Sequence, residues 1–199
     1  WDSGSKIMTI NVGGRGMVGN LKEARAYWLT RDTLVWDVEA NPDYTYTFHF
    51  TETGDPLTLD QNGVSGRPVK LTYDAAGLPA DLAAKYPHLA GLPVFHLPGQ
   101  VGTARIALKG QVAVSAVDAA GDLLDATGLQ IAGVLDDLYP YDGPLGVSYE
   151  DGAPVLRVWA PTAQRVRLIL FDDASPDTRG DANPMRVDPE TGVWTLVGE

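Results

Sequence analysis

The acidic side chains are the first residues of this sequence that could carry out chemistry. A glycosidase needs two carboxyl groups about 5–10 Å apart across the bond it breaks. The chain has adjacent pairs at Asp136-Asp137 and Asp172-Asp173. Adjacent residues of a strand point to opposite faces, so neither pair makes an obvious acid–base couple. We therefore expect solvated turns and linker at both pairs, and we assign no catalytic residue.

The residues that could hold a metal ion or act as a nucleophile are scattered. Segment 172–181 is rich in oxygen ligands, but its spacing does not fit a calcium-binding loop. The histidines, His49, His88 and His96, show no close metal-binding spacing, and there is no cysteine. No Gly-x-Ser-x-Gly motif or phosphate-binding loop is present. We predict no metal ion and no cofactor in this chain.

Tryptophan gives the one positive case for a ligand site. Aromatic rings stack on the flat C–H faces of sugars while neighbouring polar groups bind hydroxyls, but such rings also fill β-sandwich cores. A Trp inside a predicted strand cannot be assigned to a face without the register. Trp159, just before Ala160-Pro161, is expected to be especially buried. A sugar-stacking role and a core-packing role both stay open for the four candidates, which are Trp28, Trp36, Trp159 and Trp194.

Composition narrows the class of partner. The 199 residues are 44% hydrophobic, so a packed core is feasible. The net charge of −11 argues against nucleic acid and against an anionic membrane surface, and it is compatible with a neutral ligand such as a sugar. No apolar stretch approaches the roughly 20 residues of a membrane span. The chain opens on Trp1 without a basic-then-apolar leader, so we expect a fragment.

Short strands dominate the predicted elements. Tyr44, Tyr46, Phe48 and Phe50 alternate with polar residues, which is a strong strand signal. One short helix is predicted near 79–86, between two prolines. Strand-like runs lie at 27–29, 33–38, 69–73, 104–107, 111–118, 123–127, 129–134, 145–149, 155–159, 165–171 and 192–197.

The strand spacing predicts an all-β fold of two immunoglobulin-like β-sandwich units. Residues 1–20 hold five glycines and are interpreted as a linker or the tail of a preceding module. The first unit is predicted at 21–138 and the second at 144–199. Between them, 139–143 are rich in Asp, Pro and Gly, which is typical of a domain junction.

Several runs resemble one family of enzymes. The segments ARAYWLTRDTLVW at 24–36, KGQVAV at 109–114 and DATGLQIAGVLDDLY at 125–139 are similar to the second N-terminal domain of type I pullulanases and limit dextrinases. GPLG at 143–146 and LRVWAPTAQRV at 156–166 resemble the start of the isoamylase-type starch-binding module. The resemblance implies that this second unit is incomplete and that the family's catalytic (β/α)8 barrel, which needs about 250 residues, is absent.

The resemblance implies a non-catalytic accessory region of a debranching enzyme that cleaves α-1,6-glucosidic bonds. The implied partners are the parent's catalytic barrel and branched α-glucans, and calcium stays open for the parent. The implied location is secreted or on a bacterial cell surface, with the cytoplasm left open. Two roles are open, a structural spacer and a sugar-binding surface, with the spacer slightly favoured. The alternative is a freestanding immunoglobulin-like recognition or adhesion module.

Overall fold

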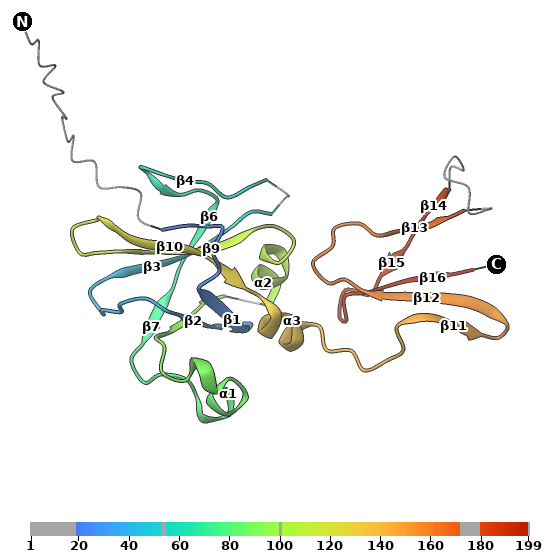
Figure 1. The fold of residues 1–199 in the computed structure, drawn as a ribbon, viewed down its shortest axis with the longest axis horizontal. Coiled ribbons are helices and arrows are strands. Elements are labelled where there is room, and N and C mark those ends of the chain that lie inside the picture. Colours follow the sequence, from blue (N-terminus) through green and yellow to red (C-terminus); the bar gives the residue numbers. More distant parts are fainter. Residues whose placement is uncertain (1–18, 53–54, 100, 172–179, 199) are drawn as a thin grey trace, which may run out of the picture.

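The chain folds into two β-rich units that lie side by side (Figure 1). The structure is a computed structural model that describes residues 19–52, 55–99, 101–171 and 180–198. The first unit holds β1 Ala26–Thr30, β2 Thr33–Trp36, β3 Thr45–Phe50, β4 Leu59–Asp60, β5 Gly63–Val64, β6 Arg67–Lys70, β7 Thr72–Asp74, β8 Val94–His96, β9 Val112–Val117 and β10 Leu123–Gln130. Its helices are α1 Ala80–Lys85, a 3₁₀ turn at Pro87–Leu89, α2 Val101–Ala107 and α3 Ala132–Leu138.

One long strand connects the two halves of the first unit's sheet. The strand order is β6-β3-β9-β10-β1-β2-β8-β7. The first part of β10 pairs with β9 in antiparallel fashion, and its end pairs with β1 in parallel at Leu129 and Gln130. The small hairpin β4–β5 forms a separate two-stranded sheet.

An aromatic core lies between these two halves. Trp28 on β1 packs edge-on against Phe48 on β3, with ring centroids 5.0 Å apart. Tyr46 on β3 lies 4.6 Å from Phe95 on β8. Neither pair of strands is adjacent in the sheet, so the halves must face each other for these rings to touch. The predicted alternation is confirmed, since Tyr46, Phe48 and Phe50 are all buried.

Two helices replace strands that the sequence predicted. Segment 104–107 belongs to α2, where Ala104 and Ala107 are buried at helical spacing together with Leu108, the residue directly after the helix. The predicted strand 129–134 is also wrong in its second half, because β10 ends at Gln130 and α3 begins at Ala132. The helix at 80–85 is confirmed. The chain is mostly β-strand with few helices, as the sequence predicts.

The second unit contains two sheets in the described residues. Its strands are β11 Gly146–Glu150, β12 Ala153–Trp159, β13 Arg167–Leu170, β14 Asp181–Pro184, β15 Arg186–Val187 and β16 Val193–Val197. Four of them form the antiparallel sheet β11-β12-β16-β15, and β13 pairs with β14. No helix in the described ranges is long and apolar enough to cross a membrane.

Polar contacts join the two units. The Lys109 ammonium donates to the carbonyls of Pro161 and Ala163, and the Gln164 side chain donates to the Lys109 carbonyl at 2.9 Å. Arg105 forms a bidentate pair with Glu190 at 2.9 Å. The units are therefore held in one arrangement by contacts outside the connecting segment.

A buried histidine makes the first unit sensitive to acid. His49 lies on the sheet face opposite the aromatic core and is 7% exposed, with Nε2 2.8 Å from the Ser115 hydroxyl. Burial lowers the pKa of His49 from 6.5 to about 4. Protons therefore bind the unfolded chain more readily between these two values, and this part of the stability is lost as pH falls from 6.5 towards 4.

We expect His49→Gln to remove this pH dependence. In the wild type, His49 contributes a fall of about 3 kcal/mol in the free energy of unfolding across that window. Urea unfolding of both proteins along a pH series measures it. The matched control is His88→Gln, because His88 is exposed. An unchanged slope in His49→Gln would show that His49 is not the titrating group.

Candidate functional site

Three of the four candidate tryptophans are buried. Trp28 and Trp36 are 0% and 1% exposed in the core of the first unit. Trp194 is 6% exposed, and its indole Nε1 donates to the Ala160 carbonyl at 2.9 Å. A sugar cannot stack on a ring that solvent does not reach. The sugar-platform prediction is therefore corrected for these three residues, which fill cores.

Trp159 differs from the other three. The sequence suggested deep burial, but the ring is half-buried at the end of β12 and lines a cavity of about 370 Å³ between the two units. We call this the joint cavity. Its walls are formed by three aromatic residues, two carboxylates and two aliphatic residues, which are Tyr139, Tyr141, Trp159, Asp136, Asp142, Pro140 and Leu145.

Hydrogen bonds fix the aromatic walls of the joint cavity. The Trp159 indole Nε1 donates to the Tyr139 carbonyl at 3.1 Å. The Tyr141 hydroxyl donates to the Pro144 carbonyl at 3.2 Å, and the ring lies so close to Gly143 that a Cβ there would be 2.5 Å from it. Both rings are therefore positioned by backbone groups of the junction, which makes the cavity a preformed feature.

Burial of Tyr139 and its contact with Arg105 also hold the segment between the two units in place. Tyr139 is 3% exposed, and burial raises the pKa of its phenol. The Arg105 guanidinium lies 5.3 Å from the centre of the Tyr139 ring. Its hydrogen bond to Glu190 lowers the pKa of that carboxyl group. Tyr139 was predicted to begin a linker, but it belongs to the core of the first unit.

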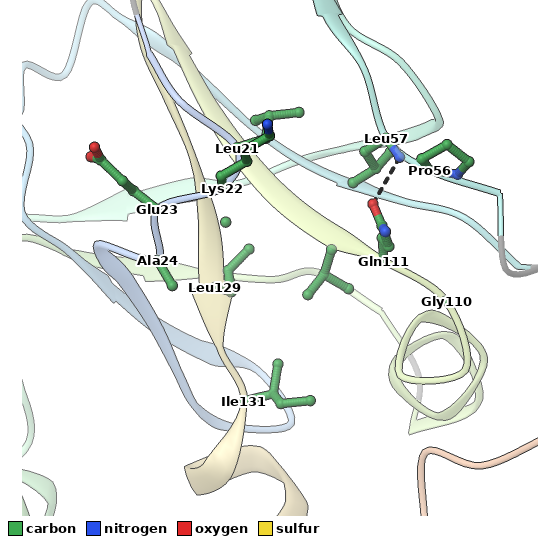
Figure 2. Close-up of a pocket in the computed structure, with 12 residues that line it drawn as sticks. Leu21, Lys22, Glu23, Ala24, Pro56, Leu57, Gly110, Gln111, Leu129 and Ile131 are labelled. Carbon is green, nitrogen blue, oxygen red and sulfur yellow. Dashed lines mark hydrogen bonds between the residues drawn. The ribbon is translucent and has the colours of Figure 1, made fainter.

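Another cavity is larger but chemically different. It measures about 660 Å³ and lies beside the start of β9 and the end of β10, as Figure 2 shows. Aliphatic side chains such as Leu21, Leu129 and Ile131 line it, and the Gln111 side chain accepts a hydrogen bond from the Leu57 backbone at 2.9 Å. Among the described residues that line it, none is aromatic, so they offer no ring for a sugar to stack on.

The second unit exposes apolar side chains on one sheet face. Val147 and Tyr149 alternate on β11 and are 65% and 75% exposed. Facing residues of an antiparallel ladder share a face. Val147 on β11 pairs with Leu156 on β12, so Val158, two residues further along β12, lies on the same face as Val147. Val158 and Val187 both pair with Trp194 on β16, so Val187 shares this face as well. We call this surface the outer apolar face and define it by Val147, Tyr149, Val158 and Val187.

The opposite face of β11 is polar. Ser148 accepts a hydrogen bond from the Arg157 guanidinium at 3.2 Å, and Glu150 pairs with the same guanidinium at 2.7 Å. Strand β11 is also the edge of its sheet, with β12 as its partner in the described residues. An exposed apolar face on an edge strand is typical of a surface that another domain or protein covers.

The remaining sequence candidates that the structure describes lie apart from one another. Within the described residues, no group of three His, Asp or Glu side chains could hold a metal ion. Asp136 and Asp137 lie on α3, where Asp137 pairs with Arg31 at 3.1 Å and Asp136 lines the joint cavity. Asp172, Asp173 and most of the segment 172–181 lie outside the described residues.

Family models match both units in order. The model of the pullulanase N2 domain matches residues 23–137, more than half of the chain. This chain belongs to the pullulanase N2 domain family. The model of carbohydrate-binding module 48, the isoamylase N-terminal domain, matches residues 144–199. The first unit is called the N2 unit from here on.

Known proteins with similar sequences are pullulanases. The chain is 35% identical over 180 residues to pullulanase 1, chloroplastic, of Arabidopsis thaliana, and 30% identical over 179 residues to a Klebsiella pneumoniae pullulanase. These matches cover 88% of this chain but only 18% and 16% of the two relatives.

Solved structures that resemble this chain are also pullulanases. The Klebsiella pneumoniae pullulanase complexed with maltotriose superposes with a TM-score of 0.76 at 32% identity, over 88% of this chain and 16% of that one. The structure of PulA from Klebsiella oxytoca gives a TM-score of 0.77 at 30% identity, over 90% of this chain and 17% of that one. The chain thus spans about a sixth of the proteins it matches.

Sequence reasoning missed most of the joint cavity. Tyr141 and Asp142 belong to a segment interpreted as linker, and only the fold brings them beside Trp159. The outer apolar face was missed as well, although the spacing of Val147 and Tyr149 at i and i+2 was visible in the sequence.

Proposed function

We propose that this chain is a non-catalytic accessory region of an α-1,6-glucan debranching enzyme. In this proposal the chain packs against the parent's catalytic (β/α)8 barrel through the outer apolar face. That exposed face is the observation that carries the proposal, because its four defining residues are apolar or aromatic and yet 38–75% exposed. Covering them would remove apolar surface from water, which stabilises an assembly by about 25 cal/mol per Å² of area buried.

The barrel is the partner that the comparisons support best. The matched relatives bear the name pullulanase, and more than four fifths of their length lies outside the part that this chain spans. The order of the two family matches, N2 and then module 48, follows the order in which the sequence resemblance placed them. That order does not favour a freestanding adhesion module.

The burial of Trp28, Trp36 and Trp194 supports the structural role over a broad sugar-binding surface. The proposal extends to a secreted or cell-surface location, which the absence of cysteines and the acidic composition allow. The plant relative is named as chloroplastic and differs in this respect.

The purified chain should release no reducing ends from pullulan. The reason is that the proposal assigns bond cleavage to the barrel, so this chain supplies no acid–base pair. A reducing-sugar assay measures the release, with an intact pullulanase as the positive control. Hydrolysis that co-purifies with the folded chain and disappears with Asp136→Asn or Asp142→Asn would overturn the proposal.

A further inference from the structure

We propose that one face of the antiparallel ribbon β13–β14, together with the start of β15, binds a phosphate monoester (Figure 1). Three exposed arginines, Arg165, Arg167 and Arg186, lie at one end of this face, and the apolar side chains of Ile169 and Phe171 lie at the other. We call these five residues the ribbon site. In this proposal the arginines hold the phosphate group and the apolar pair contacts the organic group of the ester.

The register of the two strands brings the arginines together. Arg167 pairs with the last residue of β14, and the Met185 N–H donates to the Val166 carbonyl at 3.0 Å. The ladder therefore continues beyond β14 and places Arg186 opposite Arg165. Burial agrees, because Met185 is 6% exposed between two exposed neighbours. Opposite Cβ atoms are about 5 Å apart and residues i and i+2 of a strand about 7 Å, so one anion is within reach of all three guanidinium groups.

The three guanidinium groups have no ion pair or hydrogen bond with any residue that the structure describes. The other five arginines in the described ranges each pair with a carboxylate, and they are Arg25, Arg31, Arg67, Arg105 and Arg157. Like charges directly opposite each other destabilise a sheet. Unpaired cations that face each other on a chain of net charge −11 indicate a place where an anion is bound.

The nearby carboxylates that the structure describes are directed elsewhere. Asp181 on β14 pairs with Leu170, so it lies on the opposite face of the ribbon from Arg167. Asp188, which follows β15, accepts hydrogen bonds within its own turn, from the Glu190 N–H at 3.0 Å and from the next hydroxyl at 2.8 Å. The arginine end of the ribbon site is therefore locally positive.

Phosphate is the anion that fits this arrangement best. A guanidinium group forms two parallel hydrogen bonds with a carboxylate or a phosphate. A carboxylate has two oxygens in one plane, whereas a phosphate monoester presents three acceptor oxygens in different directions and carries nearly two negative charges at neutral pH. Arginines that approach from two strands suit the phosphate.

The apolar pair extends the same face beyond the arginines. Ile169 and Phe171 follow Arg167 at intervals of two residues and are 43% and 60% exposed. A Cβ at Gly180 would lie 2.6 Å from Ile169 Cγ2 and 3.0 Å from the Phe171 ring, so the two side chains lie together. Ile169 is about 7 Å from Arg167 along the strand, so a phosphate ester with an aromatic or apolar group contacts both ends of the site.

Two probes distinguish a free phosphate from an ester. Inorganic phosphate tests the arginines alone, and phenyl phosphate tests them together with the apolar pair. The readout is the backbone N–H signals of the ribbon site in ¹H–¹⁵N spectra of the whole chain, at neutral pH and constant ionic strength. Both probes should shift these signals to saturation, and phenyl phosphate should bind about fivefold more tightly because its ring covers apolar surface.

Two variants test the two ends of the ribbon site. Arg186→Gln should weaken the binding of both probes about tenfold, and it should not lower the free energy of unfolding in phosphate-free buffer, because it removes a like-charge contact. Phe171→Ala should abolish the preference for phenyl phosphate and leave the affinity for inorganic phosphate unchanged. Arg67→Gln is the matched control, since Arg67 is exposed in the N2 unit and pairs with Glu52. It should bind both probes as the wild type does.

Three outcomes would overturn the inference. They are no saturable shift at millimolar phenyl phosphate, equal weakening by Arg186→Gln and Arg67→Gln, and equal affinity of the wild type for the two probes. None of them bears on the proposed function, because the outer apolar face uses other residues. Hydrolysis of pullulan would instead overturn the proposed function, so the two failures are separate.

Discussion

Trp28→Ala should destabilise the N2 unit by about 3–5 kcal/mol. The Trp28 ring is fully buried and packs against Phe48 across the two halves of the sheet, with centroids 5.0 Å apart. Removing it leaves a cavity that neighbouring strands cannot close without breaking their pairing. The free energy of unfolding from urea titration, followed by near-ultraviolet circular dichroism, measures the loss.

Phe171→Ala provides the control for this change. Phe171 is also a large aromatic residue, but it is 60% exposed in the second unit. Its removal should change stability by no more than about 0.5 kcal/mol. If both substitutions were equally mild, the aromatic core described for the N2 unit would be wrong.

Gly192→Ala should have an effect of similar size, about 4 kcal/mol, at the joint between the units. Gly192 has φ +68°, a conformation that L side chains rarely adopt. A Cβ there would lie 2.4 Å from the Pro161 side chain and 3.2 Å from the Tyr139 ring. The variant should unfold the second unit earlier and displace Tyr139 from the joint cavity.

Gly152→Ala separates backbone strain from steric contact. Gly152 has φ +84°, but a Cβ there would meet nothing within 4 Å. We expect a loss of only about 1 kcal/mol from the backbone conformation. Thermal unfolding of the two variants side by side measures the difference. Equal losses would show that the close packing of Gly192 on Pro161 contributes nothing.

The β character of the fold could be predicted because its strongest signals are local. The alternation around Tyr46 and Phe48 gives the face of β3 directly, since side chains of a strand alternate. His49 sits on the other face and would be expected in solvent. In the fold it is buried, and the β4–β5 hairpin lies near it, because Gln61 and Val64 line the same cavity as His49.

The helices α2 and α3 could not be predicted as easily. Each spans seven residues, and α3 has Ile131 as its N-cap residue without a side-chain capping bond. In a helix of two turns, the hydrophobic pattern is too short to show whether Val134 and Leu138 belong to a helix or to a strand. Tertiary packing at the joint, rather than local preference, decides these segments.

The candidate site depends on the relative position of the units. The sequence made all four tryptophans candidates for stacking on a sugar. Three of them are buried in the structure, and Trp159 is the one of the four that lines the joint cavity. Tyr141 and Asp142, which also line the cavity, lie in a segment whose composition predicts a domain junction, so the sequence did not indicate a binding role for them. The outer apolar face was recognisable in the alternation of β11, but only the sheet register joins it to Val158 and Val187.

The most direct test of the accessory role is association with the remainder of the proposed parent enzyme, expressed as a separate polypeptide. The chain should co-elute with it and, at 100 times the dissociation constant, stabilise it by about 2.7 kcal/mol. The double variant Val147→Asp and Tyr149→Asp should lose both effects, whereas Ser148→Asp, on the opposite face of β11, should keep them. Failure of the wild-type chain to associate, or equal association by the double variant, would contradict docking through the outer apolar face.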